Sequence, residues 1–333
     1  MLLETHATYL QHDNGPGHPE RPARLAAVLR GIERAGLDEA VVTVAPTPAP
    51  RAAIERVHAP EHLEQLEALC RSGGGDIDGD TSVVPESWEA ALLAAGAGLD
   101  AIERLDRGEA DAAFCAVRPP GHHAMPAYPM GFCLFNNVAV AAAALADRGE
   151  RVLILDYDAH HGNGTQATFY ADPRVLFVSF HQWPLYPGTG RLDETGLARG
   201  FGTTVNLPFP AGTAATAYHQ ALDQVVDPVV EHFDPTWVLL SAGFDAHRAD
   251  PLTHLQLTAG DYGDLTSHVM GYVPAGRRLA FLEGGYDLDA LASSSAATVA
   301  ALAGTVYRPE AASSGDIGRS VVEAARLLHT PDF

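Results

Sequence analysis

Short apolar runs alternate with longer stretches of helical character along most of the chain. The apolar runs lie at 41–45, 113–117, 152–156, 175–181, 237–242 and 279–283. Runs of this length are typical of strands in a parallel sheet. The alanine- and leucine-rich stretches between them, at 86–105, 137–148, 214–231 and 258–272, have the spacing of helices that cover a sheet. The pattern predicts a three-layer α/β/α fold around a central, mainly parallel sheet.

Nothing in this pattern divides the chain into separate domains. Its 333 residues would fit two domains of average length, but single α/β domains often reach this size. No internal repeat or linker interrupts the alternation. We therefore expect residues 1–333 to form one domain.

Unusual polar sequences follow four of the predicted strands. The carboxyl ends of parallel strands meet at one edge of a sheet, where ligands commonly bind. The sequences are Arg-Pro-Pro-Gly-His-His at 118–123 with Gly-Phe-Cys-Leu-Phe-Asn-Asn at 131–137, Asp-Tyr-Asp-Ala-His-His-Gly-Asn-Gly at 156–164, Ser-Ala-Gly-Phe-Asp-Ala-His-Arg-Ala-Asp at 241–250, and Glu-Gly-Gly-Tyr at 283–286. We expect the functional site at this edge.

Two of these sequences together indicate a metal site. Asp158 and His160 are two positions apart, so in extended backbone their side chains point to the same side and can bind one ion. Alone, the pair would equally suit a helix N-cap beside a hydrogen-bonded histidine. Asp245 at the end of another strand supplies a third ligand and leaves coordination positions open, which favours a hydrolytic metal centre.

The adjacent imidazoles of His122 and His123 suit proton transfer in such a centre. A metal-bound water needs a base to take its proton, and the leaving amine needs an acid. Each imidazole would need an acceptor to orient it, and Asp156 and Asn163 flank the metal ligands at a suitable place. Tyr286 follows two glycines, so its phenol could donate to a developing oxyanion, although a buried structural tyrosine fits the same pattern.

Aromatic residues near these motifs predict an apolar wall. Gly131 and Phe132 form one part of it, and Trp183 and Tyr186 in His-Gln-Trp-Pro-Leu-Tyr-Pro-Gly at 181–188 form another. Each aromatic residue alone would equally suit the protein core.

Composition narrows the class of partner. The net charge of −21, from 21 basic and 42 acidic residues, argues against general affinity for nucleic acid or an anionic membrane. A cationic substrate or partner fits better, and a solubility effect alone is the alternative. The three cysteines Cys70, Cys115 and Cys133 have no CxxC spacing and predict neither a disulfide framework nor a structural zinc site.

The sequence offers no signal for secretion or membrane insertion. Its first residues lack a basic region followed by an apolar core, and no run of about 18 apolar residues occurs. We expect a cytoplasmic protein, and the oligomeric state stays open.

Taken in order, five motifs resemble those of the zinc-dependent histone deacetylase family. They are Pro-Gly-His-His, Gly-Phe-Cys, Asp-Tyr-Asp-Ala-His-His-Gly-Asn-Gly, Ala-Gly-Phe-Asp and Glu-Gly-Gly-Tyr. The family includes bacterial deacetylase-like amidohydrolases and acetylpolyamine amidohydrolases, and the similarity runs from His-Pro-Glu-Arg-Pro at 18–22 to beyond Tyr286. It implies the arginase/deacetylase fold, with an eight-stranded, mainly parallel sheet between helices.

The resemblance also implies an activity. The protein would be a zinc-dependent amidohydrolase that removes acetyl or other short acyl groups from acyl-lysine-type amides by attack of a metal-bound water. Acetylated polyamines are the alternative substrates. One zinc ion per chain would be held by Asp158, His160 and Asp245.

The remaining catalytic roles follow from the same resemblance. His123 would be the general base and acid, His122 its electrostatic partner, and Tyr286 the oxyanion donor. Asp156 would orient His122 and, with backbone carbonyls and Ser179, hold a structural potassium ion.

Substrate-binding roles are implied around the pocket. Phe132, next to Gly131, would clamp the acyl-lysine stem together with Tyr186. Asp80 in Asp-Gly-Asp-Thr would bind substrate backbone amides at the rim, and Arg24 would lie near an inner channel. Leu252 matches the gatekeeper position, where polyamine-selective members similar to class II enzymes have glutamate and lysine deacylases have leucine.

Asn163 departs from the class I pattern, in which aspartate stands at this position. Class II-like members have asparagine, so the chain resembles that group. Because asparagine supplies no negative charge to raise the pKa of the neighbouring imidazole, class I proton transfers do not carry over directly to His123.

Two other functions compete with this interpretation. A binuclear manganese ureohydrolase would share the fold, but its second metal needs carboxylates where this chain has Gly162 and His247. A non-catalytic acyl-lysine binding module would keep the pocket without turnover, although every inferred catalytic position here is filled.

Overall fold

The central sheet has eight strands, and each is parallel to its neighbours. In the computed structural model, which describes residues 1–329, the strand order is β2-β1-β5-β10-β9-β6-β7-β8. The strands are β1 (Leu2–Glu4), β2 (Val42–Val44), β5 (Ala113–Cys115), β6 (Val152–Asp156), β7 (Val175–Gln182), β8 (Thr204–Phe209), β9 (Trp237–Ala242) and β10 (Arg278–Leu282). The predicted α/β class and eight-stranded parallel sheet are confirmed.

Two strands of the sheet were not predicted from the apolar pattern. β1 has only three residues, too few to show a period. β8 contains Asn206 and Pro208, which interrupt its apolar run. Proline is tolerated in β8 because this strand lies at the edge of the sheet.

Helices cover both faces of the sheet. The α-helices are α1 (Ala23–Arg34), α2 (Arg51–Ile54), α3 (Pro60–Arg71), α4 (Ser87–Asp106), α5 (Asn137–Asp147), α6 (Asn163–Phe169), α7 (Ala215–Ala221), α8 (Asp227–Phe233), α9 (Ala259–Met270), α10 (Leu288–Leu302) and α11 (Arg319–His329). Short 3₁₀ helices lie at η1 (Ala7–Leu10), η2 (Asp38–Ala40) and η3 (Ala198–Gly200). A separate hairpin joins β3 (Gly75–Asp76) to β4 (Ser82–Val83).

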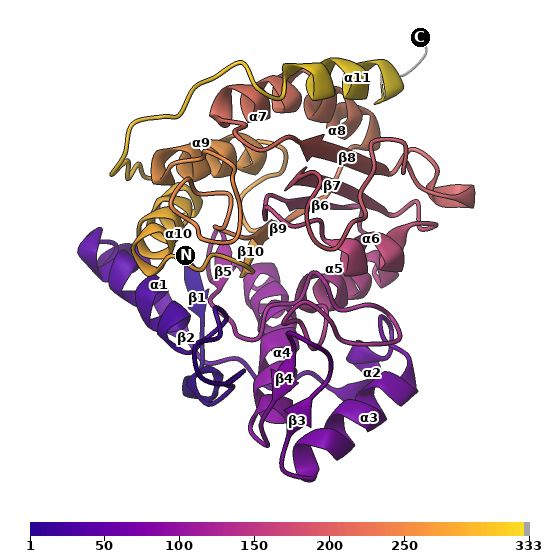
Figure 1. The fold of residues 1–333 in the computed structure, drawn as a ribbon, viewed down its shortest axis with the longest axis vertical. Coiled ribbons are helices and arrows are strands. Elements are labelled where there is room, and N and C mark those ends of the chain that lie inside the picture. Colours follow the sequence, from indigo (N-terminus) through magenta and orange to yellow (C-terminus); the bar gives the residue numbers. More distant parts are fainter. Residues whose placement is uncertain (330–333) are drawn as a thin grey trace.

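Figure 1 shows the strands running between two groups of helices. On one side, α5 contacts both α4 and α6. On the other side, α10 packs between α1 and α9, and α11 packs on α7 and β8. The strands are therefore buried on both faces, which explains why β6 is apolar at four successive positions before it ends at Asp156.

The stretch predicted to be helical over 214–231 is helical, but it is not a regular α-helix throughout. The segment forms α7, then the π-helix η4 (Leu222–Val226), then α8. Pro228 in the first turn of α8 has no backbone N–H to continue the regular helical hydrogen bonds. The proline thus accounts for the irregular turn before it.

Segments from both ends of the chain contribute to the middle of one sheet. β1 pairs with β5, and β5 pairs with β10. This interleaving supports the prediction of one domain. All three cysteines are buried and unpaired, and none of the described helices is long and apolar enough to cross a membrane.

Candidate active site and metal centre

The ends of β6 and β9 bring the three predicted metal ligands together. His160 Nδ1 lies 2.7 Å from Asp245 Oδ2 and 3.2 Å from Asp158 Oδ1. One donor atom from each residue lies within 4.8 Å of the others, and all three side chains are buried. The remaining lone pairs of the carboxylates accept backbone N–H groups of Ala159 and Gly284 at 2.7 and 2.8 Å.

Two glycines leave the space that these carboxylates occupy. A Cβ atom on Gly243 would lie 1.9 Å from Asp158 Oδ2. A Cβ on Gly284 would lie 2.6 Å from Asp158 Oδ2 and from Asp245 Oδ2. The glycines of Ala-Gly-Phe-Asp and Glu-Gly-Gly-Tyr are therefore required by close packing against the ligands.

The cluster has the chemistry of a divalent metal site. Two carboxylates and one imidazole nitrogen converge, and this set would neutralise a doubly charged cation. A buried cluster of like charges is costly unless a cation compensates it. Burial and the nearby Asp158 carboxylate raise the pKa of Asp245 to about 7. A bound cation would offset this cost of keeping the Asp245 carboxylate ionised.

Both histidines of the Pro-Gly-His-His loop lie beside this cluster, each with its own acceptor. His122 Nδ1 is 2.9 Å from Asp156 Oδ2, and His123 Nδ1 is 2.7 Å from Asn163 Oδ1. The two ring centroids are 4.0 Å apart. Both side chains are buried, so their protonation depends on these few neighbours.

The two acceptors separate the pKa values of the imidazoles. Burial lowers the pKa of His122, but the carboxylates of Asp156 and Asp158 outweigh burial and raise it to about 10. For His123, burial and the charge of His122 hold the pKa well below its usual value. The structure therefore favours a proton on His122 and a neutral His123, as a general base requires.

Tyr286 reaches the same pocket from the end of β10. Its backbone N–H donates to Asp250 Oδ2 at 2.7 Å, and the guanidinium carbon of Arg24 lies 5.0 Å from the centre of its ring. Burial raises the pKa of the phenol well above its usual value, so it stays a proton donor. Arg24, predicted near an inner channel, thus lies against the catalytic tyrosine candidate.

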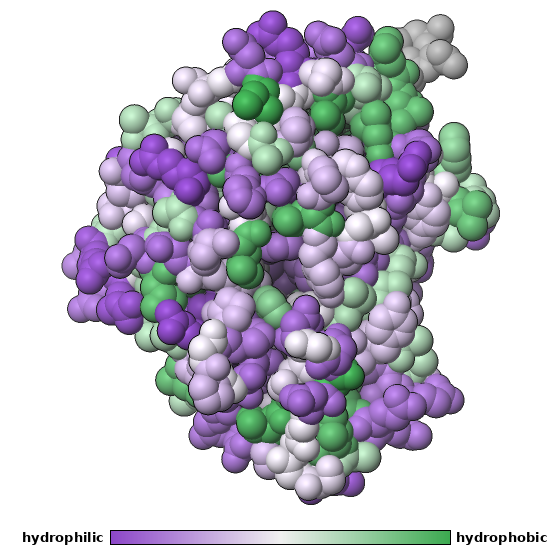
Figure 2. Space-filling model, viewed as in Figure 1, coloured by the Kyte–Doolittle hydropathy of each residue, from purple (hydrophilic) through white to green (hydrophobic). Residues whose placement is uncertain are grey.

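A cavity of about 230 Å³ leads to these groups. It is lined by Asp80, His123, Gly131, Phe132, His160, Leu185, Tyr186, Leu252 and Tyr286. Every predicted substrate-binding residue is in this set, and Leu185 is an addition. Figure 2 shows a narrow hollow near the centre of the face, with hydrophobic and hydrophilic residues on its rim.

One predicted wall residue lies elsewhere. Trp183 lines a different hollow of about 660 Å³, together with Leu327 and Leu328 of α11. That hollow contains none of the predicted catalytic residues. The aromatic wall therefore includes Tyr186 but not Trp183, because the loop after β7 turns the indole toward α11.

Asp156 and Ser179, predicted to hold a monovalent ion, are paired neighbours. They stand opposite each other in the register of β6 and β7. Asp156 Oδ1 accepts the backbone N–H of Asp158 at 3.0 Å, and Ser179 Oγ lies 3.0 Å from His181 Nδ1. The hydrogen bond from the Asp158 N–H links Asp156 directly to the loop that carries the predicted metal ligands Asp158 and His160.

Sequence reasoning gave no role to Glu283, although it begins a recognised motif. Its Oε2 atom accepts the backbone N–H groups of Gly121 and His122 at 2.7 and 3.1 Å. The carboxylate therefore fixes the loop that carries both histidines. Its position immediately after an apolar strand was the available signal.

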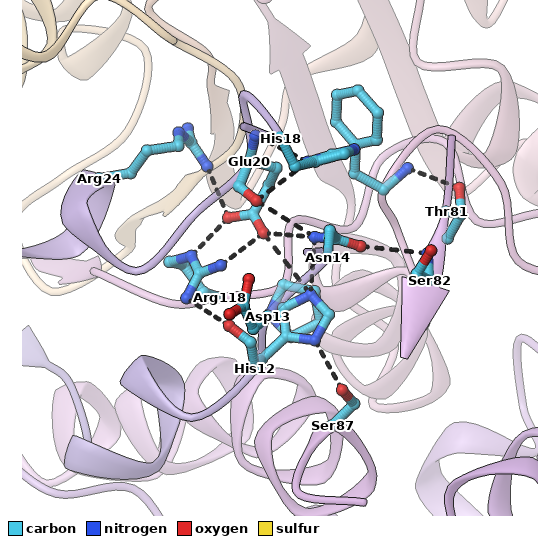
Figure 3. Close-up of polar contacts among 12 residues, drawn as sticks. His12, Asp13, Asn14, His18, Glu20, Arg24, Thr81, Ser82, Ser87 and Arg118 are labelled. Atoms are coloured by element: carbon cyan, nitrogen blue, oxygen red, sulfur yellow. Dashed lines mark hydrogen bonds and ion pairs between the residues drawn. The ribbon is translucent and has the colours of Figure 1, made fainter. Parts of the chain in front are cut away.

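A second unpredicted feature is a buried ionic network around Glu20 (Figure 3). The carboxylate of Glu20 contacts the guanidinium groups of Arg118 and Arg24 and the amide of Asn14, all in the interior. Burial alone would raise the pKa of Glu20, but Arg118 outweighs it and lowers the pKa to about 2. The network anchors the loop before α1 against the base of the site.

The positions that a second metal would need are occupied differently. His247 Nε2 lies 2.7 Å from Glu310 Oε2, in a pair outside the cluster. A Cβ on Gly162 would lie 2.3 Å from Asp156 Oδ2, which leaves no room there for a carboxylate side chain. The geometry matches a single metal centre.

The fold and the site together define a candidate hydrolytic metal centre at the carboxyl edge of a parallel sheet flanked by helices. A sequence profile for the histone deacetylase domain matches residues 18–302. The chain belongs to the histone deacetylase family and is a deacetylase. Membership implies a metal cofactor, and the buried group of Asp158, His160 and Asp245 is a candidate to hold it.

Individual relatives agree with this assignment. The chain is 42% identical over 306 residues to a probable deacetylase of Archaeoglobus fulgidus, covering 90% of this chain and 85% of that protein. It is 39% identical over 284 residues to a histone deacetylase-like amidohydrolase of Pseudomonas aeruginosa, covering 84% and 75%. The crystal structure of the HDA15 HD domain superposes with a TM-score of 0.92 at 35% identity, covering 98% of this chain and 95% of that one.

Proposed function

We propose that the metal is zinc, held by Asp158, His160 and Asp245. The carboxylate–imidazole set supports zinc, and the pairing of His247 with Glu310 away from this set supports a single ion in it. Zinc would supply Lewis acidity toward the amide carbonyl and toward water. These three residues would bind the ion, and Gly284 would keep the Asp158 carboxylate in place through its N–H.

The other site residues would move protons and stabilise charge. His123 would take a proton at its free ring nitrogen, because Asn163 occupies Nδ1. His122, protonated beside Asp156, would add positive charge without itself releasing a proton easily. Tyr286 would donate its phenolic hydrogen to the oxyanion, and Arg24 would hold the ring from behind.

The substrate would be an acylated lysine side chain. One observation carries this proposal: the inner wall contains Phe132, Tyr186 and Leu252, and the only carboxylate among the lining residues outside the metal cluster is Asp80. Such a wall suits an uncharged methylene stem. Asp80 is exposed, as a group that binds substrate backbone N–H groups should be.

We also propose a structural potassium ion beside β6 and β7. Asp156 and Ser179 would supply oxygen ligands, with backbone carbonyls of the same loops. Their register across the two strands supports this placement. The ion would stiffen the loop from Asp156 to His160.

Metal counting combined with turnover tests the main proposal. The purified protein should hold one zinc ion per chain and deacetylate an acetyl-lysine peptide, and Asp245→Ala should lose both properties. Asp227→Ala is the matched control, because Asp227 lies in a separate, partly exposed group with Asp223 and His268. Two tightly bound transition-metal ions, or full turnover in Asp245→Ala, would contradict the site.

A further inference from the structure

The backbone of Phe132 has a conformation that a non-glycine residue rarely adopts. Its φ angle is +67°, and the preceding Gly131 has a φ of +57°. Such a conformation persists when surrounding contacts hold it. The backbone N–H of Phe132 donates to Thr81 Oγ1 at 3.0 Å, so a side chain from the turn before β4 holds this residue of the pocket wall.

The same hydroxyl also contacts the rim of the pocket. Thr81 Oγ1 donates to Asp80 Oδ1 at 3.0 Å, and Thr81 is 1% exposed. One buried group therefore accepts from the wall residue and donates to the rim carboxylate. The hydroxyl has little freedom, since the Thr81 N–H donates to Asp78 Oδ1 at 2.7 Å and the Thr81 carbonyl accepts from Ile77.

His18 makes a second bridge between the same two residues. Its Nδ1 lies 3.0 Å from both the N–H and the carbonyl oxygen of Glu20. Its Nε2–H donates to the carbonyl of Asp80 at 3.0 Å, because a carbonyl oxygen can only accept. Its ring packs edge-on against Phe132 with centroids 4.6 Å apart. Asp80 and Phe132 are thus linked twice, through Thr81 and through His18.

A buried ionic network anchors this arrangement. Glu20, two residues after His18 in the chain, is fully buried and pairs with Arg118 and Arg24 (Figure 3). Asn14 joins the network to β4, because its Oδ1 accepts the N–H of Ser82 at 3.2 Å. The rim residue Asp80 and the wall residue Phe132 are therefore both linked to one buried polar network.

We propose that Thr81 is a positioning residue that couples the hold of Asp80 on the substrate backbone to the placement of the Phe132 ring on the acylated stem. This inference rests on the proposed acyl-lysine substrate. With Oδ1 committed to Thr81, the Oδ2 atom of Asp80 at the cavity lining is left to accept substrate backbone N–H groups. Substrates with backbone N–H groups gain from this arrangement, and a bare acylated amine does not.

Substitutions of Thr81 separate this role from a general structural one. Thr81→Val keeps the shape, removes the hydroxyl and leaves the Phe132 N–H without its acceptor. Thr81→Ser keeps the hydroxyl and serves as the rescue. Thr203→Val is the matched control, because it removes a hydroxyl that donates to the Gly200 carbonyl at 2.8 Å just before β8, away from the pocket.

Two substrates provide the readout. One is a blocked acetyl-lysine tripeptide, and the other is N-pentylacetamide, which keeps the acetylated stem without backbone amides. We expect Thr81→Val to lower kcat/KM for the tripeptide about tenfold or more, mainly through KM. The loss for N-pentylacetamide should be under about threefold, and Thr81→Ser and Thr203→Val should stay within about threefold of wild type for both substrates.

An Asp80→Asn background supplies the second measurement. If Thr81 acts through Asp80, the loss from Thr81→Val on the tripeptide shrinks in that background. Equal losses for the two substrates, full additivity with Asp80→Asn, or a Thr81→Ser variant as impaired as Thr81→Val would overturn the inference. If Thr81→Val does not fold, the Thr81→Ser and Asp80→Asn variants are compared with wild type instead. A loss of about tenfold in tripeptide kcat/KM in Thr81→Ser, which keeps the hydroxyl, would contradict the role of the hydroxyl.

Failure of the proposed function has a different signature. Wild-type protein that cleaves neither compound contradicts the acyl-lysine assignment. In that case the coupling is tested by binding: the dissociation constant of the tripeptide should be about tenfold higher for Thr81→Val than for wild type. Wild-type protein that cleaves the tripeptide while Thr81→Val matches it contradicts the coupling alone.

Discussion

His123 Nδ1 lies 2.7 Å from the side-chain oxygen of Asn163. The partner of this imidazole is therefore a neutral amide, whereas its neighbour His122 has a carboxylate. An amide oxygen orients the ring but supplies no negative charge to the imidazolium form, and burial and the charge of His122 hold the pKa of His123 well below its usual value. The relationship assigns the neutral, proton-accepting state to His123.

Asn163→Asp should move the pH profile of the enzyme. A carboxylate at this position favours the charged imidazole, so the pKa of His123 rises. Because the neutral form is the active base, the acid limb of the profile for kcat/KM should shift to higher pH. Asn163→Ser, which adds no charge, is the control. An unchanged acid limb in Asn163→Asp would remove His123 from the role of base.

Tyr286→Phe should reduce turnover strongly and leave metal binding intact. Removing one oxyanion donor costs roughly 10²–10³ in kcat in comparable sites. The zinc content should stay at one per chain, because the phenol is not among the three ligands. Steady-state kinetics alongside metal analysis checks both halves, and near-normal kcat in the variant would exclude Tyr286 from the mechanism.

Removal of the metal should lower thermal stability as well as activity. A cation that binds only the folded state stabilises it by mass action, and its loss leaves two carboxylates buried at the cluster. Chelation should therefore lower Tm, and one equivalent of zinc should restore it. Asp158→Ala supplies the comparison, because its Tm should no longer respond to zinc. A Tm in wild type that ignores chelation would place the ion elsewhere.

Glu4 should make stability dependent on pH. Burial and the nearby Asp100 carboxylate raise the pKa of Glu4 from 4.5 to about 8, despite Arg104 at 3.8 Å. A raised folded-state pKa contributes stability that is complete below pH 4.5 and is lost as pH rises through 8. Glu4→Gln removes this dependence, at most about 1.4 kcal/mol per pH unit. Denaturant unfolding should show the variant gaining on wild type between pH 5 and pH 8, and a constant difference would contradict the assignment.

The sequence predicted the features that depend on local pattern. The apolar runs gave six of the eight strands, and the polar residues at their ends gave the site, because parallel strands deliver those ends to one edge. The residues that meet there come from strands far apart in sequence. The order of the five motifs, which resembles that of a known family, indicated which of them come together. The strands and helices predicted from local pattern are present in the structure, with their ends shifted by a few residues.

Other features depend on contacts that no local pattern records. Glu20 and Arg118 are 98 positions apart, and the local sequence around either residue does not predict its contact with the other. The contact between Thr81 and Phe132 joins a tight turn to a left-handed backbone, neither of which shows in an apolar pattern. Such pairings are set by tertiary packing.

Leu252 is the residue on which the choice of substrate depends. It lines the cavity and offers no charge to the distal ammonium of a polyamine. A glutamate at this position would supply one, so Leu252→Glu should move the ratio of kcat/KM values toward polyamines. Leu252→Gln is the uncharged control and should move it much less.

The most direct test of the proposed substrate is a comparison of kcat/KM for acetyl-lysine peptides with the values for N-acetylputrescine and N8-acetylspermidine on wild-type protein. The structure predicts that the peptides are preferred, since the apolar wall accepts a methylene stem and Asp80 can bind backbone N–H groups. A polyamine preference above about tenfold, equivalent to about 1.4 kcal/mol of transition-state stabilisation, would contradict the acyl-lysine assignment.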